Sequence, residues 1–130
     1  MLASESEKKM KRVLIESPFA GDVESNIAYA RRCVLDCVKR GEAPYASHLF
    51  FTQPGILDDE KAEERALGIE AGLAWGAAAE RVVVYVERGI SAGMRYGIAR
   101  AKGRGQSVEI RAIDREVSEE ERREVEGHHV

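Results

Sequence analysis

Three short segments hold most of the residues in this 130-residue chain that are able to bind a ligand or carry out chemistry. They span residues 17–22, 47–59 and 87–93. The third follows an apolar run, RVVVYV at 81–86, and places glycines and a serine directly before a helical pattern. A loop of this kind exposes backbone N–H groups at a helix N-terminus, which suits a phosphate or another anion.

The side chains in and around these segments predict a set of ligand contacts. Ser17 would bind a ribose or phosphate oxygen, and Phe19 would cover a base or sugar face. His48 would bind a hydroxyl or relay a proton near neutral pH. The predicted ligand-binding residues are Ser17, Pro18, Phe19, Asn26, His48, Arg65, Gly89, Ser91, Gly93, Met94 and Arg95. Purely structural roles remain open. The first segment could form a turn with Phe19 packed inward, and His48 could be hydrogen-bonded to a backbone carbonyl group.

Two carboxylates are candidate catalytic acids or bases. Glu87 lies just past the third apolar run, within reach of Ser91 and Gly93, and Glu64 lies near the start of a predicted helix. The alternative for Glu87 is a solvated loop carboxylate, and acidic residues are common in a first helical turn. The sequence has no metal-ligand spacing, so we expect neither a metal nor a cofactor.

Composition narrows the classes of partner. The chain has 20 basic and 23 acidic residues, a net charge of −3 that argues against binding duplex nucleic acid. No apolar run approaches the roughly 20 residues that cross a bilayer, so no membrane partner is expected. The polar N-terminus lacks the apolar core of a signal peptide. Two cysteines, four apart on one helix face, fit packing better than a disulfide framework, and we expect a cytoplasmic protein.

Strand and helix patterns alternate along the chain, which predicts an α/β domain with a parallel sheet. We expect strands at 12–17, 43–47, 81–86 and 107–113. We expect helices at 22–40, 60–79 and 93–103, and a last helix capped by Ser118 and Glu121. Residues 1–11 are predicted to be a flexible segment and 12–127 a single domain. Ligands of such sheets bind beyond the carboxyl ends of the strands, where the three segments would meet.

Three stretches, at 13–30, 44–75 and 81–111, resemble the nucleoside 2-deoxyribosyltransferase superfamily, especially its small phage and bacterial members. They include VLIESPFAGD, PYASHLFFTQPG and ERGISAGMRYG. The resemblance implies a three-layer, flavodoxin-like (Rossmannoid) fold with a four- to five-stranded parallel sheet and a cleft for nucleosides or nucleotides. It also implies cleavage of an N-glycosidic bond, with the sugar passed to another base or to water. Members usually form homodimers or larger homo-oligomers, and the small residues around Trp75 are compatible with such an interface.

One departure from the family pattern changes the expected chemistry. The family nucleophile is a glutamate in a segment resembling G-M-E-x-G, and the matching segment here is Gly93-Met94-Arg95-Tyr96-Gly97. A guanidinium cannot attack an anomeric carbon, but it binds phosphate well. We therefore expect nucleotide or nucleoside binding, with Glu87 or Glu64 as a displaced catalytic acid. A non-catalytic sensor or sequestering protein, or a structural subunit without a ligand, remains an alternative.

Overall fold

The computed structural model describes residues 10–127 of the chain, so all but two residues of the predicted flexible segment lie outside it. Its core is a sheet of four parallel strands in the order β2-β1-β3-β4. The strands are β1 (Arg12–Glu16), β2 (Ala43–Tyr45), β3 (Arg81–Tyr85) and β4 (Ser107–Arg111). Because β1 lies between β2 and β3, the chain reverses its direction of strand addition beside β1, where sheets of this type bind ligands.

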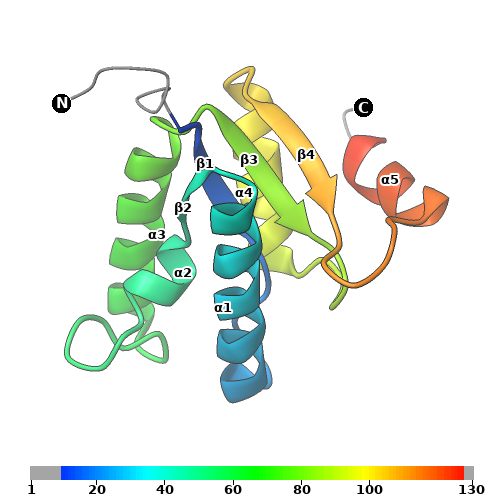
Figure 1. Cartoon of the computed structure of the whole chain (residues 1–130). Coiled ribbons are helices and arrows are strands. Elements are labelled where there is room, and N and C mark those ends of the chain that lie inside the picture. The colour runs from blue at the N-terminus through cyan, green and yellow to red at the C-terminus, as the bar shows by residue number, and fades with distance from the viewer. Residues whose placement is uncertain (1–9, 128–130) are drawn as a thin grey trace, which may run out of the picture.

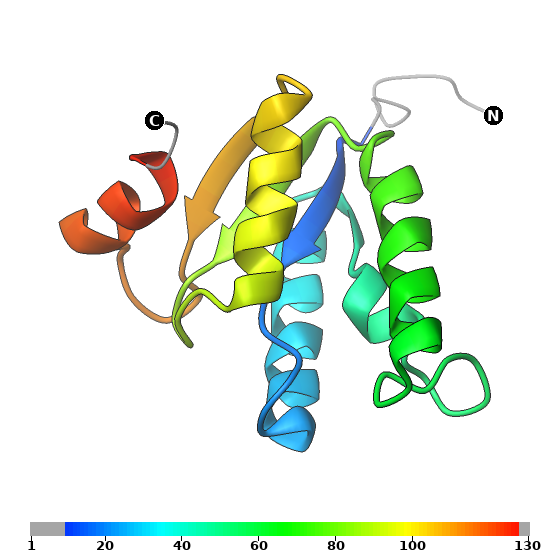
Figure 2. The same cartoon turned by 180° about the vertical axis from the view of Figure 1, so that it is seen from behind.

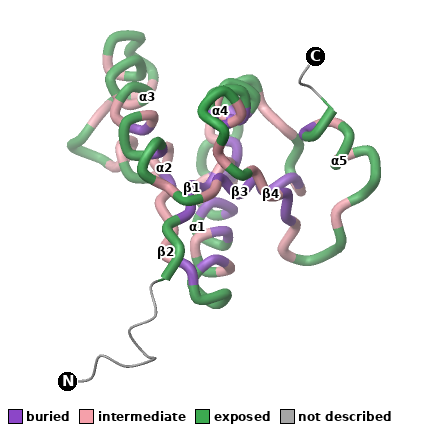
Figure 3. The backbone as a smooth tube through the Cα atoms, turned by 90° about the horizontal axis from the view of Figure 1, so that it is seen from above, coloured by how far each residue is buried: buried purple, intermediate pink, exposed green. Residues whose placement is uncertain are grey.

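Helices cover both faces of the sheet and give the protein three layers. They are α1 (Val23–Lys39), α2 (Ser47–Phe50), α3 (Ala62–Gly76), α4 (Ala92–Gly103) and α5 (Glu119–Glu126). Helix α1 lies on one face, and α3 and α4 lie on the other (Figures 1 and 2). The view along the sheet shows α5 beyond β4, at the opposite end from α2 and α3 (Figure 3). This arrangement confirms the predicted α/β, flavodoxin-like class with a parallel sheet.

Alternating side chains of the strands fill two separate apolar layers. Toward α1, Ile15 and Val83 pack with Cys33 and Cys37, which are both buried free thiols. Toward α4, Leu14 packs with Met94 and with other buried side chains of that helix and of β3. The strand β3 is therefore buried on both faces, as its unbroken apolar run predicts.

Side-chain caps mark the starts of three helices. The Asp22 side chain accepts a hydrogen bond from the Ser25 N–H, and Ser118 and Glu121 form the predicted capping box of α5. Ser91 caps α4 by accepting from the Met94 N–H, so this helix begins one residue before Gly93. Capping side chains satisfy N–H groups that have no partner inside the helix, which fixes where each helix begins.

The segment after β2 differs from the sequence prediction. The sequence pattern indicates no helix between residues 48 and 59, but the first of these residues belong to the single turn of α2. This turn brings Phe50 and Phe51 to Tyr45, with ring centroids 6.2 and 6.4 Å from that of Tyr45. Helix α3 is also shorter than the expected 60–79. Clustering of the aromatic rings, a tertiary contact, explains a helical turn that local spacing does not show.

Glycines allow α3 to approach the rest of the domain closely. A Cβ atom on Gly72 would lie 2.6 Å from the Ser47 Oγ, and one on Gly76 would lie 2.8 Å from the Leu14 Cδ2. The small residues of this helix therefore serve packing within the chain. Trp75 is 63% exposed, and its ring centroid lies 6.0 Å from that of Tyr45. None of the described helices combines the length and apolar character that a membrane crossing requires.

Candidate functional site

The candidate site is a pocket of about 510 Å³ beyond the carboxyl end of β1, between α3 and α4. All three segments singled out in the sequence contribute to its wall. Ser17 and Phe19 come from the first, His48 from the second and Ser91 from the third. The wall also includes apolar side chains of α2, α3 and the loop between them, such as Phe51, Leu57 and Leu73. The volume lies within the range of small-molecule sites, which are mostly apolar with a few polar groups.

The carboxyl group in this pocket comes from Glu16, the last residue of β1, which sequence analysis missed. Its side chain is partly buried, and none of the described residues donates a hydrogen bond to it or pairs with it. Desolvation by the surrounding protein raises its pKa from 4.5 to about 8. Glu16 is therefore largely protonated at neutral pH and is free to donate a hydrogen bond into the pocket.

Space for this carboxyl group is provided by a glycine of α4. A Cβ atom built on Gly97 would lie 2.0 Å from Oε2 of Glu16 and 2.6 Å from its Cδ. Any other residue at this position would overlap the carboxyl group. The absence of a side chain at Gly97 therefore leaves room for the Glu16 carboxyl group in this position.

His48 and Ser17 form a hydrogen-bonded polar pair in the wall of the same pocket. The Nε2 of His48 lies 2.7 Å from the Oγ of Ser17, and both residues line the pocket. Ser17 is buried, and desolvation lowers the pKa of His48 to about 4. The imidazole is consequently neutral at physiological pH, so one ring nitrogen is an acceptor and the other a donor. This pair is suited to hold a ligand hydroxyl rather than an anion.

The mouth of the pocket is charged. Asp59, Glu64 and Arg65 line it, and the first two also line an adjoining outer hollow of about 620 Å³. The Glu64 Oε1 accepts a hydrogen bond from the Asp58 N–H at 2.6 Å, and its Oε2 lies 3.8 Å from the Lys61 Nζ. Acidic groups outnumber basic ones around the outer hollow.

A comparison with known protein families assigns the chain to one of them. A family model described as "Domain of unknown function (DUF7768)" matches residues 11–111, which include all four strands. The chain belongs to this family. No protein in the curated set matches the sequence significantly.

A solved structure supports the fold of this DUF7768 chain. It is a 2-deoxyribosyltransferase from the psychrotolerant bacterium Bacillus psychrosaccharolyticus, with a TM-score of 0.57 and 12% sequence identity. The match covers 85% of this chain and 79% of that one. At this identity the likeness establishes a shared fold, in agreement with the resemblance noted in the sequence.

Most of the predicted ligand residues come together in the pocket of the DUF7768 chain. Those that line it are Ser17, Phe19, His48, Arg65, Ser91, Gly93 and Met94, and the candidate acid Glu64 joins them at the mouth. Met94 is 1% exposed, and its sulfur accepts a hydrogen bond from the Ser91 N–H. Its main role is therefore to pack α4 against the sheet and to hold the third loop.

The remaining predicted ligand residues are not part of the pocket wall. These are Pro18, Asn26, Gly89 and Arg95. The Asn26 side-chain amide donates to the carbonyl oxygens of Phe19 and Ala20, at 3.1 and 3.0 Å, and so holds the first loop in place. Gly89 has a φ of +86°, which fits a turn.

Arg95 does not point toward the pocket, where the sequence predicts that it binds a phosphate. Its guanidinium pairs with Glu124 of α5 at 2.7 Å. Successive residues of an α-helix are rotated by about 100°, so Arg95 is rotated by about 200° from both Gly93 and Gly97 and lies on roughly the opposite side of α4. The two glycines face the pocket, so the arginine between them faces away from it.

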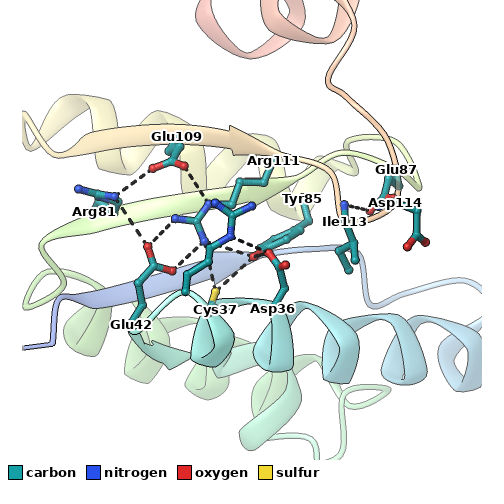
Figure 4. A network of polar contacts seen from close by, with 11 residues as sticks. Asp36, Cys37, Glu42, Arg81, Tyr85, Glu87, Glu109, Arg111, Ile113 and Asp114 are labelled. Atoms are coloured by element: carbon teal, nitrogen blue, oxygen red, sulfur yellow. Dashed lines mark hydrogen bonds and ion pairs between the residues drawn. The ribbon is translucent and has the colours of Figure 1, made fainter.

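The hydrogen-bond partners of Glu87 give it a structural role. Its carboxylate accepts hydrogen bonds from the Tyr29 hydroxyl at 3.0 Å and from the backbone N–H groups of Ile113 and Asp114 at 2.8 and 2.9 Å. Figure 4 shows it joining the end of β3 to the chain that leaves β4. These contacts tie two loops together, and Glu87 does not line the pocket.

A buried ion pair stabilises the other face of the sheet, also shown in Figure 4. The guanidinium of Arg111, 3% exposed, donates to both carboxylate oxygens of Glu42 at 2.8 and 2.6 Å. The hydrogen bonds from Arg111 lower the pKa of Glu42. Tyr85 links the pair to Asp36 of α1 through a 2.7 Å hydrogen bond. Within residues 10–127 no group of three or more acidic, histidine or cysteine side chains is arranged to hold a metal ion.

Proposed function

We propose that the pocket between α3 and α4 binds a nucleoside or nucleotide. The observation that carries the proposal is the convergence of three loops around an apolar pocket at the point where the strand order reverses. That is the ligand position in open α/β sheets. The shared fold with a 2-deoxyribosyltransferase directs the proposal toward nucleosides and nucleotides among the small ligands that would fit.

The pocket wall has the groups that such a ligand needs. The rings of Phe19 and Phe51 and the side chain of Leu73 offer apolar surface to a base. The Ser17–His48 pair and the Ser91 hydroxyl offer hydrogen bonds to sugar hydroxyls. We propose that the base contacts the apolar wall and that the sugar faces the end of β1.

A variant with a blocked pocket tests this proposal. Ala92 lies in the first turn of α4 and lines the pocket, whereas Ala99 is exposed on the same helix and does not. Ala92→Trp should abolish the stabilisation that nucleosides or nucleotides give the wild-type protein, and Ala99→Trp should preserve it. A ligand at 100 times its dissociation constant adds about 2.7 kcal/mol to folding stability, readily seen in a thermal-shift assay. The proposal is wrong if no member of a nucleoside and 5′-nucleotide panel stabilises the wild-type protein.

A second candidate function is binding without catalysis, as in a sensor or sequestering protein. The placement of Arg95 favours it, because this residue, which stands where the resemblance to 2-deoxyribosyltransferases implies a nucleophile, pairs with Glu124 outside the pocket. Stabilisation by a ligand that stays intact would support this candidate. Release of free base would support an N-glycosidic hydrolase or transferase instead.

We also propose that the chain assembles as a homodimer or larger homo-oligomer through α3. This helix is apolar around much of its circumference, yet Leu67, Ile69 and Trp75 are 60%, 45% and 63% exposed. Exposed apolar side chains that gather on one surface of a protein mark interaction sites. Leu67 and Trp75 lie about 80° apart around the helix, so a second copy packed over them would bury both side chains.

A further inference from the structure

We infer that Glu16 is the catalytic proton donor of this pocket and that it protonates the leaving base when an N-glycosidic bond is hydrolysed. The inference rests on the proposed function, because it assumes a nucleoside or nucleotide in the pocket. It assigns the acid to β1 rather than to the loop after β3 or to the start of α3.

The first argument is that Glu16 has no structural task that explains its position. A carboxyl group removed from water is costly unless it is hydrogen-bonded or paired. None of the described residues pairs with Glu16, whereas the carboxylates of Glu87 and Glu42 are fully engaged. Unpaired groups with perturbed titration in a pocket are typical of functional sites.

The second argument comes from the other titratable and charged groups that line the same pocket. They are His48 of α2, Asp59 in the loop before α3, Glu64 and Arg65 of α3, and Tyr96 of α4. The Glu64 carboxylate already accepts a backbone hydrogen bond and lies near Lys61. His48 is neutral and occupied by Ser17. Arg65 cannot give up its proton in a protein. Asp59 also has no partner among the described residues, but it belongs to the loop before α3, whereas Glu16 ends a core strand.

The third argument concerns the protonation state. Burial raises the pKa of Glu16 to about 8, so the acid carries its proton at neutral pH. A general acid works best when its pKa lies near the operating pH. A carboxylate nucleophile would need the opposite environment, so the pocket fits proton donation better than covalent attack.

The reaction balances with water as the second reactant. The bond between the anomeric carbon and the base nitrogen breaks, and its electron pair goes to the base. The Glu16 proton neutralises that nitrogen, so the base leaves in its neutral N–H form. The oxygen of a water molecule bonds to the anomeric carbon, and the proton it loses restores the Glu16 carboxyl group.

Gly97 is a positioning residue in this scheme, because a side chain at this place would displace the carboxyl group. Another glycine of the same helix provides a matched control for this substitution. Gly103 ends α4, and a Cβ built there would have no atom within 4 Å. Gly97→Ala should therefore disturb Glu16, whereas Gly103→Ala should not.

The test measures base release from a panel of nucleosides and 5′-nucleotides, together with ligand stabilisation of each variant. We expect Glu16→Gln to bind ligand but to release base at least about 100-fold more slowly, the usual minimum contribution of a general acid. The wild-type rate should fall as the pH rises through about 8. Gly97→Ala should slow base release and shift the pH dependence of the rate. If both changes act through the Glu16 carboxyl group, adding Gly97→Ala to Glu16→Gln should lower the rate little further. Gly103→Ala should match the wild-type protein.

Three outcomes would overturn the inference. Base release by Glu16→Gln within about threefold of the wild-type rate would exclude a general acid there. Ligand stabilisation of the wild-type protein without any base release would refute the reaction and leave the proposed binding function standing. Absence of both stabilisation and base release would refute the binding function, and the inference with it.

Discussion

The environment of Glu16 has a consequence for folding stability that is independent of any ligand. Burial raises the pKa of this side chain from 4.5 to about 8. Between these pH values the folded protein keeps a proton that the unfolded chain loses. The stability contributed by the protonated form is complete below pH 4.5 and is lost as the pH rises through about 8. Glu16→Gln removes this titration while it keeps the size of the side chain, so we expect the variant to gain stability over the wild-type protein at alkaline pH.

The size of the expected stability change follows from the pKa shift of Glu16. Each pKa unit corresponds to about 1.4 kcal/mol, which would give an upper limit of about 5 kcal/mol for the full difference. The side chain is only partly buried and faces a pocket open to water. Solvent screening reduces the expected change to about 2–3 kcal/mol.

Urea unfolding at pH 5 and pH 9 measures this change directly. The free energy of unfolding of Glu16→Gln relative to the wild-type protein should increase by about 2–3 kcal/mol between the two conditions. The lowered pKa of His48, about 4, destabilises the folded state as the pH falls below 6.5, but it acts equally in both proteins and cancels. Glu63→Gln, an exposed residue in the first turn of α3, is the matched control. If the difference between Glu16→Gln and the wild-type protein does not depend on pH, then Glu16 titrates normally and the reasoning is wrong.

Three further changes test other parts of the structure. Asp59→Asn should strengthen binding of a 5′-nucleotide relative to its nucleoside by about fivefold, since it removes a negative charge at the pocket mouth, and calorimetric titration of both ligands will measure the ratio. Trp75→Ser should lower the mass measured by light scattering if α3 forms the subunit interface, and a wild-type protein that is already monomeric would contradict that proposal. Glu87→Gln should cost about 1–3 kcal/mol in urea unfolding because one backbone donor loses its acceptor, and it should leave ligand binding unchanged.

Much of the fold follows from local patterns in the sequence. The apolar run at 81–86 identifies a strand buried on both faces, and the capping residues Asp22 and Ser118 fix two helix starts. The alternation of strands and helices then leaves few arrangements other than a parallel sheet with its loops at one edge. The position of the pocket was therefore predictable, because the carboxyl ends of parallel strands all meet at that edge.

The acid within the pocket was harder to find. Glu16 ends an apolar strand, RVLIE, and looks like the polar boundary of that strand. Alternation along β1 places it on the same face as Leu14, toward α4, but only the packed structure shows a carboxyl group there without a partner. Glu87 attracted attention because it lies in a loop, yet its hydrogen bonds come from Tyr29 and from the chain after β4, which are distant in sequence.

The direction of Arg95 was open to prediction from helical geometry. Met94, Ile98 and Ala101 form the buried stripe of α4, and their spacing fixes the rotation of the helix. Residue 95 then points away from the side occupied by positions 93 and 97. The resemblance to the family motif drew attention to the type of residue at this position, whereas the function depends equally on the side of the helix that carries it.

Glycine spacing connects these observations to the shape of the pocket. Gly93 and Gly97 are one turn apart on α4, and Gly68 and Gly72 are one turn apart on α3; all four line the pocket. On α3, a Cβ atom on Gly68 would lie 3.3 Å from Leu57 and one on Gly72 would lie 2.6 Å from Ser47, so the space beside these two glycines is filled, whereas α4 leaves a hollow beside Gly97. The hollow is filled in part by Glu16 from β1, for which Gly97 provides the space. Gly97, which looks like a helix weakness in the sequence, therefore leaves room for the carboxyl group that we infer to act on a bound ligand.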